Sequence, residues 1–234
     1  MKVIILCGGL GSRLSEETKT KPKPMVRIGK KPIVCHIMEI YKKFGFNEFI
    51  LAAGYKSGYI KKYFKKRKFG FKVDVISTGE TTLTGGRLLR LKKIIKKNET
   101  FMLTYGDGLT SQNIKRLLNF HISQNKIATV TAVRPPVRFG ELQIAKNTVS
   151  EFKEKPQSKK GWINGGFFVF NYKVFDYIKN DKISFEKEPM EKLSKNKNLM
   201  AYKHLGFWKC MDNLGDKNYL EKLYKENKFK PWKK

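Results

Sequence analysis

The stretch KVIILCGGLGSRL, residues 2–14, indicates the fold of this chain. Residues 2–7 form a short, largely apolar run with β-branched side chains, and the run stops at Gly8. Such a run predicts a buried strand that leads into a glycine turn. Ligands of open parallel sheets bind at the carboxyl ends of the strands, so the turn stands where a binding site is expected.

Short apolar runs and amphipathic segments continue to alternate up to about residue 135. We predict strands over 48–54, 71–78, 100–108 and 127–133, and helices over 31–45, 57–68, 85–97 and 113–125, with Ser57 capping the second helix. This alternation predicts a Rossmann-like α/β fold with a mixed, mostly parallel sheet flanked by helices. Further strands over 140–145, 148–156 and 163–171 predict a smaller, β-containing C-terminal subdomain within one domain of residues 1–234.

The composition excludes several classes of protein. With 234 residues and 40% hydrophobic residues, the chain can bury the core of one domain. Its three cysteines lack CxxC spacing, which argues against a structural zinc site and a disulfide framework. No apolar run approaches the length of a membrane span or of a signal peptide, so we expect a cytoplasmic protein that does not bind membranes.

The formal net charge of +30 is the most extreme property of the sequence. A nucleic acid is the first partner to consider for such a chain. However, only eight of the 50 basic residues are arginine, and the lysines are spread along the whole chain. We therefore expect no nucleic-acid partner, and electrostatic attraction of small anionic molecules instead. A non-catalytic relative that binds nucleic acid is the alternative.

The loop GGLGSRLSEETKTKPKP, residues 8–24, combines glycines with cations. It lacks the Gly-Lys-Ser/Thr of a Walker loop, and Leu14 occupies the third glycine position of a dinucleotide fingerprint. Backbone N–H groups of the glycines, together with Arg13 and Lys23, suit a polyphosphate. A glycine turn followed by a solvated basic loop explains the same residues, and the loop alone does not separate the two interpretations.

Two aspartates extend the first interpretation. Asp107 stands between glycines just after a predicted buried strand, and Asp212 follows the aromatic pair at 207–208. Mg²⁺ prefers one or two carboxylates together with water and phosphate oxygens, so both residues are candidate metal ligands. The alternatives are an ordinary turn residue for Asp107 and a helix-capping or first-turn acid for Asp212.

Taken in order, these stretches resemble the sugar-1-phosphate nucleotidyltransferases, which share a GT-A-like fold. The family signature GG-x-G-[ST]-R-L-x(n)-K-P is met by residues 8–24. Within the family, the chain is similar to the glucose-1-phosphate cytidylyltransferase branch in TGGRLLR (84–90), YGDG (105–108), RFGEL (138–142), EKP (154–156), INGGFFVF (163–170), GFWKCMDNLGDK (206–217) and PWK (231–233).

The resemblance implies that CTP and glucose 1-phosphate give CDP-glucose and pyrophosphate with Mg²⁺ as cofactor. It divides the chain into a nucleotide-binding part, about 1–135, and a sugar-phosphate-binding part, about 136–234. It assigns the nucleotide to Leu6, Cys7, Gly8, Gly9, Leu10, Gly11, Ser12, Arg13, Lys23, Thr82, Arg87 and Gly106. It assigns the sugar phosphate to Glu154, Lys155, Asn164 and Gly165, with Lys155 holding the phosphate and Glu154 and Asn164 the sugar hydroxyls. It assigns the metal to Asp107 and Asp212, and catalysis to Arg13, Lys23, Asp107 and Asp212.

The chain departs from the branch at one place. Cytidylyltransferases usually carry a longer segment between the equivalents of residues 59–64 and 71–80, where this chain has only KKRKFG. In the family that segment contributes to contacts between subunits around the nucleotide site. The resemblance therefore leaves open whether this chain forms a homo-oligomer, which base it selects and which phosphorylated acceptor it uses.

Overall fold

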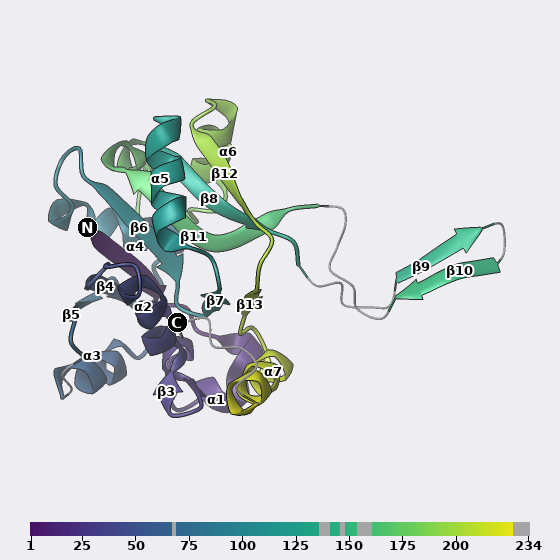
Figure 1. Ribbon diagram of the computed structural model, residues 1–234. Helices are drawn as coiled ribbons and strands as arrows, with labels where there is room; N and C mark the ends of the chain where they lie inside the picture. The colour runs from purple at the N-terminus through teal and green to yellow at the C-terminus, as the bar shows by residue number, and fades with distance from the viewer. Residues whose placement is uncertain (67–68, 136–140, 146–147, 154–160, 227–234) are drawn as a thin grey trace.

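The opening stretch forms strand β1 (Lys2–Cys7), which lies inside a seven-stranded sheet. A computed structural model describes residues 1–66, 69–135, 141–145, 148–153 and 161–226 (Figure 1). The strand order is β12-β8-β11-β6-β1-β4-β5. The other six strands are β4 (Glu48–Ala53), β5 (Lys72–Ser77), β6 (Thr100–Tyr105), β8 (Ala128–Val133), β11 (Ile163–Asn171) and β12 (Leu199–His204).

The sheet is mixed and mostly parallel, as predicted. Strand β1 runs parallel to β4 and β6, β4 runs parallel to β5, and β8 runs parallel to β12. Strand β11 is antiparallel to both of its neighbours, β6 and β8. Because β11 and β12 follow residue 135 in sequence, the C-terminal part of the chain completes the main sheet.

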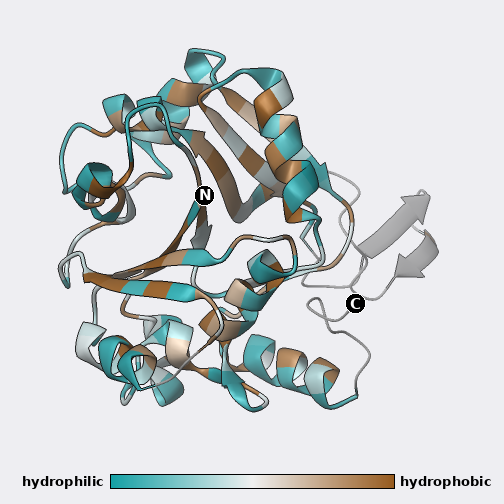
Figure 2. Cartoon of the chain, turned by 60° about the vertical axis from the view of Figure 1, so that its left-hand side comes forward, coloured by the Kyte–Doolittle hydropathy of each residue, from teal (hydrophilic) through white to brown (hydrophobic). Residues whose placement is uncertain are grey.

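Helices cover both faces of the sheet, and each face has its own apolar cluster. Along β1, Val3 and Ile5 face one cluster while Ile4 and Leu6 face the other, as the alternation of a strand requires. Figure 2 shows hydrophobic residues concentrated on the strands and mixed faces on the helices. The helices are α1 (Ser15–Thr18), α2 (Ile33–Lys42), α3 (Ser57–Lys65), α4 (Thr84–Arg90), α5 (Ile114–Gln124), α6 (Glu188–Lys195) and α7 (Leu214–Lys225).

Three smaller two-stranded sheets complete the described fold. They pair β2 (Arg27–Ile28) with β3 (Lys31–Pro32), β7 (Gly108–Thr110) with β13 (Trp208–Cys210), and β9 (Glu141–Ala145) with β10 (Thr148–Lys153). Short 3₁₀ segments are η1 (Ser12–Leu14), η2 (Lys23–Met25), η3 (Lys92–Ile94) and η4 (Tyr172–Tyr177). Within the described parts of the chain, no helix has both the length and the apolar character of a membrane span.

The structure corrects three local expectations. Ser57 does not cap α3: the N-cap is Lys56, which adopts a left-handed conformation with φ 50°, and no side chain caps this end. The predicted helix over 85–97 ends at Arg90 and continues as the separate turn η3. The predicted strand over 100–108 breaks after Tyr105, so that Gly106 and Asp107 form a turn between β6 and β7.

Ile5 tests the contribution of β1 to stability, because its side chain is fully buried in this interior strand of the sheet. We expect Ile5→Ala to lower the free energy of unfolding by about 2–5 kcal/mol, since it removes buried methyl groups and leaves a cavity. The control is Ile122→Ala, at a side chain that is 60% exposed, where we expect a change within about 0.5 kcal/mol. Urea denaturation measures both, and equal destabilisation would contradict the assignment of β1 to the core.

Candidate active site

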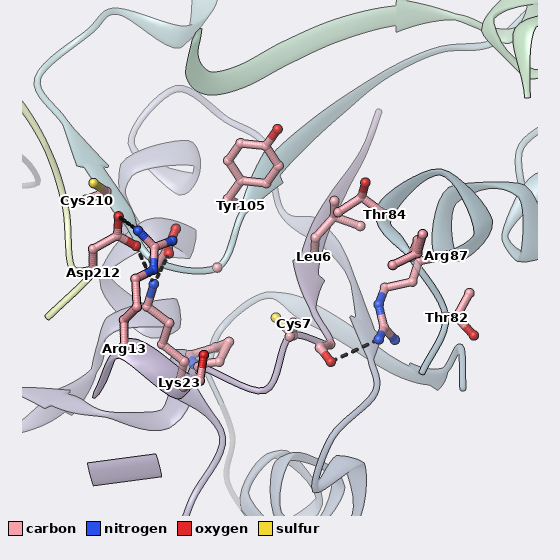
Figure 3. Close-up of a pocket in the computed structure, with 18 of the residues that line it drawn as sticks. Leu6, Cys7, Arg13, Lys23, Thr82, Thr84, Arg87, Tyr105, Cys210 and Asp212 are labelled. Carbon is pink, nitrogen blue, oxygen red and sulfur yellow. Dashed lines mark hydrogen bonds and ion pairs between the residues drawn. The ribbon is translucent and has the colours of Figure 1, made fainter. Parts of the chain in front are cut away.

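A pocket of about 560 Å³ lies at the carboxyl ends of β1 and β6, where the parallel sheet predicts a ligand site. Figure 3 shows that its walls come from segments far apart in sequence. Of the residues assigned above, the pocket is lined by Leu6, Cys7, Gly8, Gly9, Gly11, Ser12, Arg13, Lys23, Thr82, Arg87, Gly106, Asp107, Asn164 and Asp212.

Two assigned residues that the structure describes, Leu10 and Gly165, are not among the lining residues. Leu10 is 61% exposed at the surface of the glycine loop. Gly165 is buried, and its carbonyl accepts a hydrogen bond of 2.7 Å from Trp208 Nε1. Glu154 and Lys155 lie outside the residues that the structure describes, so their roles stay predictions from the sequence.

The glycine loop is folded tightly against the segments that follow it. Gly11 has φ 67°, a left-handed conformation that favours glycine, and its carbonyl accepts hydrogen bonds from Leu14 N and Thr18 Oγ1. A Cβ at Gly11 would lie 3.0 Å from Lys23 Cβ. The turn therefore brings Lys23 against the loop, and only a residue without a side chain fits there.

Arg87 holds the backbone of the glycine loop through hydrogen bonds. Its guanidinium donates to the carbonyls of Gly8 (2.9 Å), Gly79 (2.6 Å) and Glu80 (3.1 Å), and to Thr78 Oγ1 (2.9 Å). The side chain is buried, and burial together with the charge of Arg90 lowers the pKa of Arg87. These bonds connect the loop after β1 to the loop after β5. Arg87 also lines the pocket, and its role as a nucleotide ligand stays a prediction.

The two candidate metal ligands, 105 residues apart in the chain, come together through a short strand pairing. Cys210 of β13 pairs with Gly108 of β7, and Met211 N donates to the carbonyl of Asp107 at 2.9 Å. Asp212 is the next residue after Met211, so its carboxylate lies beside that of Asp107. The sequence indicated two separate aspartates, and the pairing of β7 with β13 brings their carboxylates next to each other.

Two cations neutralise this carboxylate pair (Figure 3). Lys23 Nζ lies 2.6 Å from Asp107 Oδ2 and 2.8 Å from Asp212 Oδ1, and Arg13 contacts Asp212 Oδ2 at 2.8 Å. Burial raises the pKa of Asp212, but the hydrogen bond and charge of Lys23 and the charge of Arg13 outweigh it and lower the pKa overall. Burial lowers the pKa of Lys23, and the two aspartates outweigh it in turn. Asp212 is therefore ionised and Lys23 protonated at neutral pH.

The pair suits a divalent cation of the Mg²⁺ type. Carboxylate oxygens are the ligands that Mg²⁺ prefers, and the Lys23 ammonium already places a positive charge within hydrogen-bond distance of both. Among the described residues, no group of three or more His, Cys, Asp or Glu side chains could hold a metal ion. Mg²⁺ bound by one or two carboxylates typically completes its coordination with phosphate oxygens and water.

A wall of uncharged polar groups lies elsewhere in the pocket. It combines Asn164, which the resemblance assigned to the site, with Tyr105, for which the sequence predicted no role. Tyr105 OH donates to Glu186 Oε1 at 2.7 Å and accepts from Asn164 Nδ2 at 3.2 Å. Burial and the neighbouring Glu186 raise the pKa of Tyr105, so its hydroxyl keeps its proton at neutral pH. Glu186 lies 81 residues from Tyr105 in an unremarkable polar segment, and only the fold brings the two together.

Comparison with known proteins agrees with this geometry. The chain is 46% identical to the glucose-1-phosphate cytidylyltransferase of Salmonella typhimurium, over all of this chain and 99% of that protein. It is 36% identical to a D-glycero-alpha-D-manno-heptose 1-phosphate guanylyltransferase of Campylobacter jejuni, over 84% of this chain and 88% of that protein. The crystal structure of HddC from Yersinia pseudotuberculosis complexed with GMP-PN has a TM-score of 0.76 and 28% identity, over 95% of this chain and 99% of that one.

The comparison also bears on the segment that the sequence indicated as shortened. The alignment with the Salmonella protein runs over 255 positions, whereas this chain has 234 residues, so that relative carries residues that this chain lacks.

The family model described as nucleotidyl transferase matches residues 2–214, which include the glycine loop and both aspartates. On this match, and on the full-length similarity, the chain belongs to the nucleotidyl transferase family of enzymes.

Proposed function

We propose that the chain transfers a cytidylyl group from CTP to glucose 1-phosphate, giving CDP-glucose and pyrophosphate. The observation that carries this proposal is the pairing of Asp107 and Asp212 around one cation beside the glycine loop. The choice of CTP and glucose 1-phosphate is supported by the 46% identity to the Salmonella enzyme over the full chain.

The reaction needs no nucleophile from the protein. A phosphate oxygen of the sugar phosphate attacks the α-phosphorus of CTP, and the bond from that phosphorus to the oxygen bridging to the β-phosphate breaks. The pocket lining described here includes no histidine, and burial raises the pKa of the Cys210 thiol to about 11 and that of Cys7 further. Both thiols stay protonated at neutral pH, which agrees with direct attack by the substrate.

The protein contributes position and charge. Two anions must approach each other, and negative charge grows on the departing pyrophosphate, so fixed cations stabilise the transition state. Arg13 is 72% exposed, and exposed ion pairs contribute only about 0–1 kcal/mol, so its guanidinium can turn from Asp212 to a phosphate at little cost. Lys23, 14% exposed between loop and carboxylates, is the second phosphate ligand in this proposal.

Mg²⁺ is the proposed cofactor, and Asp107 and Asp212 are the residues that would hold it. When bound, the ion would supply Lewis-acid stabilisation of phosphate charge. In the proposed arrangement, Glu154 and Lys155 bind the sugar phosphate, as the sequence predicts. The protein works as a soluble enzyme of nucleotide-sugar synthesis in the cytoplasm.

The same chemistry with another pair of substrates is the second candidate. The Campylobacter relative is named a guanylyltransferase of a heptose 1-phosphate, and it is 36% identical to this chain. In this proposal Arg13, Lys23, Asp107 and Asp212 contact phosphates and the metal ion, so they do not discriminate between bases or sugars. Base and acceptor therefore need a direct measurement.

The first test measures pyrophosphate release with each of the four nucleoside triphosphates, a panel of phosphorylated sugars and Mg²⁺. We expect CTP with glucose 1-phosphate to give the highest kcat/KM. A higher value for GTP with a heptose 1-phosphate would favour the second candidate. Release with no pair at all would contradict both.

Substitution of the carboxylates tests the proposed metal ligands. We expect Asp107→Asn and Asp212→Asn each to lower kcat by at least about a hundredfold, because each removes a charge that acts at the reacting phosphates. Circular dichroism and the melting temperature check that both variants fold. The control is Asp74→Asn, whose carboxylate is 53% exposed on β5 and contacts Lys72. Near-normal rates in either site variant would disprove its assignment.

Lys23 gives a test that does not depend on turnover. Its ammonium occupies the space between the carboxylates, so a metal ion without nucleotide has to displace it. We expect Lys23→Met to bind Mn²⁺ alone about tenfold more tightly than the unmodified protein, since hydrogen bonds to charged groups contribute about 1.5–3 kcal/mol. Electron paramagnetic resonance of free Mn²⁺ measures the affinity, with Lys21→Met as control. Equal affinity in all three proteins would contradict the shared site.

A further inference from the structure

The polar wall of the pocket has a fixed hydrogen-bond direction, from Asn164 through Tyr105 to Glu186. We infer that Tyr105 and Glu186 are positioning residues that hold the Asn164 amide so that it donates a hydrogen bond to a hydroxyl oxygen of the acceptor sugar. The inference rests on the proposed function in taking the acceptor to be a sugar phosphate. The contact of Asn164 with a sugar hydroxyl is what the family resemblance implies. The inference adds the positioning by Tyr105 and Glu186, to which neither the resemblance nor the comparisons give a role.

The orientation of the Asn164 amide follows from its neighbours. Its Oδ1 accepts a hydrogen bond of 2.8 Å from Gly166 N, so the carbonyl side faces its own strand. Its Nδ2 therefore faces the Tyr105 hydroxyl, 3.2 Å away. An amide nitrogen has two N–H groups, and the described residues provide a partner for only one of them. Asn164 lines the pocket and is exposed to it, so the second N–H is available to a ligand.

The Tyr105 hydroxyl transmits this orientation. Because it accepts from Asn164, its own proton must go to the second partner, Glu186 Oε1, at 2.7 Å. The ring is held edge-on to Phe168 at a centroid distance of 5.8 Å. A Cβ at Gly166, which has φ 76°, would lie 2.4 Å from Tyr105 Cδ2, so the strand passes close against the ring. The tyrosine thus has one position and one direction of donation.

Glu186 terminates the chain of hydrogen bonds and is itself fixed from two elements. Its Oε2 accepts from Ser184 Oγ at 2.6 Å and from Thr84 Oγ1 at the start of α4, and Thr84 Oγ1 in turn accepts from Phe185 N at 2.9 Å. The segment before Glu186 packs directly on α4: a Cβ at Gly86 would lie 2.0 Å from the Asp181 carbonyl. Hydrogen bonds to a carboxylate are stronger than those between neutral groups, so Glu186 is the most firmly held end of this chain of hydrogen bonds.

The chemistry of the wall suits a sugar ring better than a phosphate or a base. Figure 3 shows the Tyr105 ring apart from the Arg13, Lys23 and Asp212 group and from Thr82 and Arg87 beside the glycine loop. The wall groups that face the cavity are a hydroxyl and an amide, and the negative charge of Glu186 lies behind them, unfavourable for an anion. A site built to hydrogen-bond one hydroxyl discriminates against an acceptor that lacks it.

The test compares binding of CDP-glucose and of CDP, which lacks the sugar, to the unmodified protein and to Tyr105→Phe. The substitution keeps the ring and removes only the hydroxyl. Since a neutral hydrogen bond contributes about 0.5–1.5 kcal/mol, we expect the Kd of CDP-glucose to rise about three- to tenfold and that of CDP to stay unchanged. Isothermal titration calorimetry measures both, and Tyr202→Phe on the distant strand β12 is the matched control.

The outcomes separate this inference from the proposed function. An equal rise in both Kd values, no change in either, or no CDP-glucose binding to the unmodified protein overturns the positioning role. Selective weakening of CDP-glucose supports it, even if the unmodified protein releases no pyrophosphate, in which case the proposed function fails alone. With turnover, we expect Tyr105→Phe to raise the KM of the acceptor, and to leave the KM of CTP and kcat nearly unchanged.

Discussion

The contact of Lys23 with both Asp107 and Asp212 is the interaction on which the rest of the site depends. Two carboxylates side by side in one partly buried place repel each other unless a cation lies between them. The lysine offsets this repulsion and holds both carboxylates in position, and Gly11 lets the loop fold against it. The pairing of β7 with β13, the turn at Gly11 and the ion pairs of Lys23 thus together determine the position of the two carboxylates.

Arg87 presents a different problem, because its buried positive charge is hydrogen-bonded to neutral groups and not to a carboxylate in the described structure. Its hydrogen bonds in the described structure go to three carbonyls and one hydroxyl, which spread the charge over two loops. Gly8 and Gly54 leave the space for it, since a Cβ at either would lie within 2.3 Å of the guanidinium. The glycines therefore serve two purposes: they let backbone approach a ligand, and they make room for the cation that supports that backbone.

The order of elements and the candidate charges could be predicted from the sequence because they are local or periodic. The run over 2–7 specified a buried strand whatever its neighbours, and the alternation up to residue 135 specified parallel pairing. The exact ends could not be predicted: α3 begins with an uncapped Lys56, and the 85–97 segment changes from α to 3₁₀ geometry, where tertiary packing decides over local propensity. Tyr105 and Glu186 could not be predicted as a pair, since no motif connects them.

By itself, the sequence determined the class of fold, the glycine loop and the residues Arg13, Lys23, Asp107 and Asp212 as carriers of charge. Only the tertiary structure decided what these residues do to one another. Side chains 105 positions apart along the chain meet because β7 and β13 share backbone hydrogen bonds, and two segments so far apart in sequence pair only in the folded chain. The same holds for the polar wall, whose direction of hydrogen bonding exists only when α4, β6 and β11 are packed together.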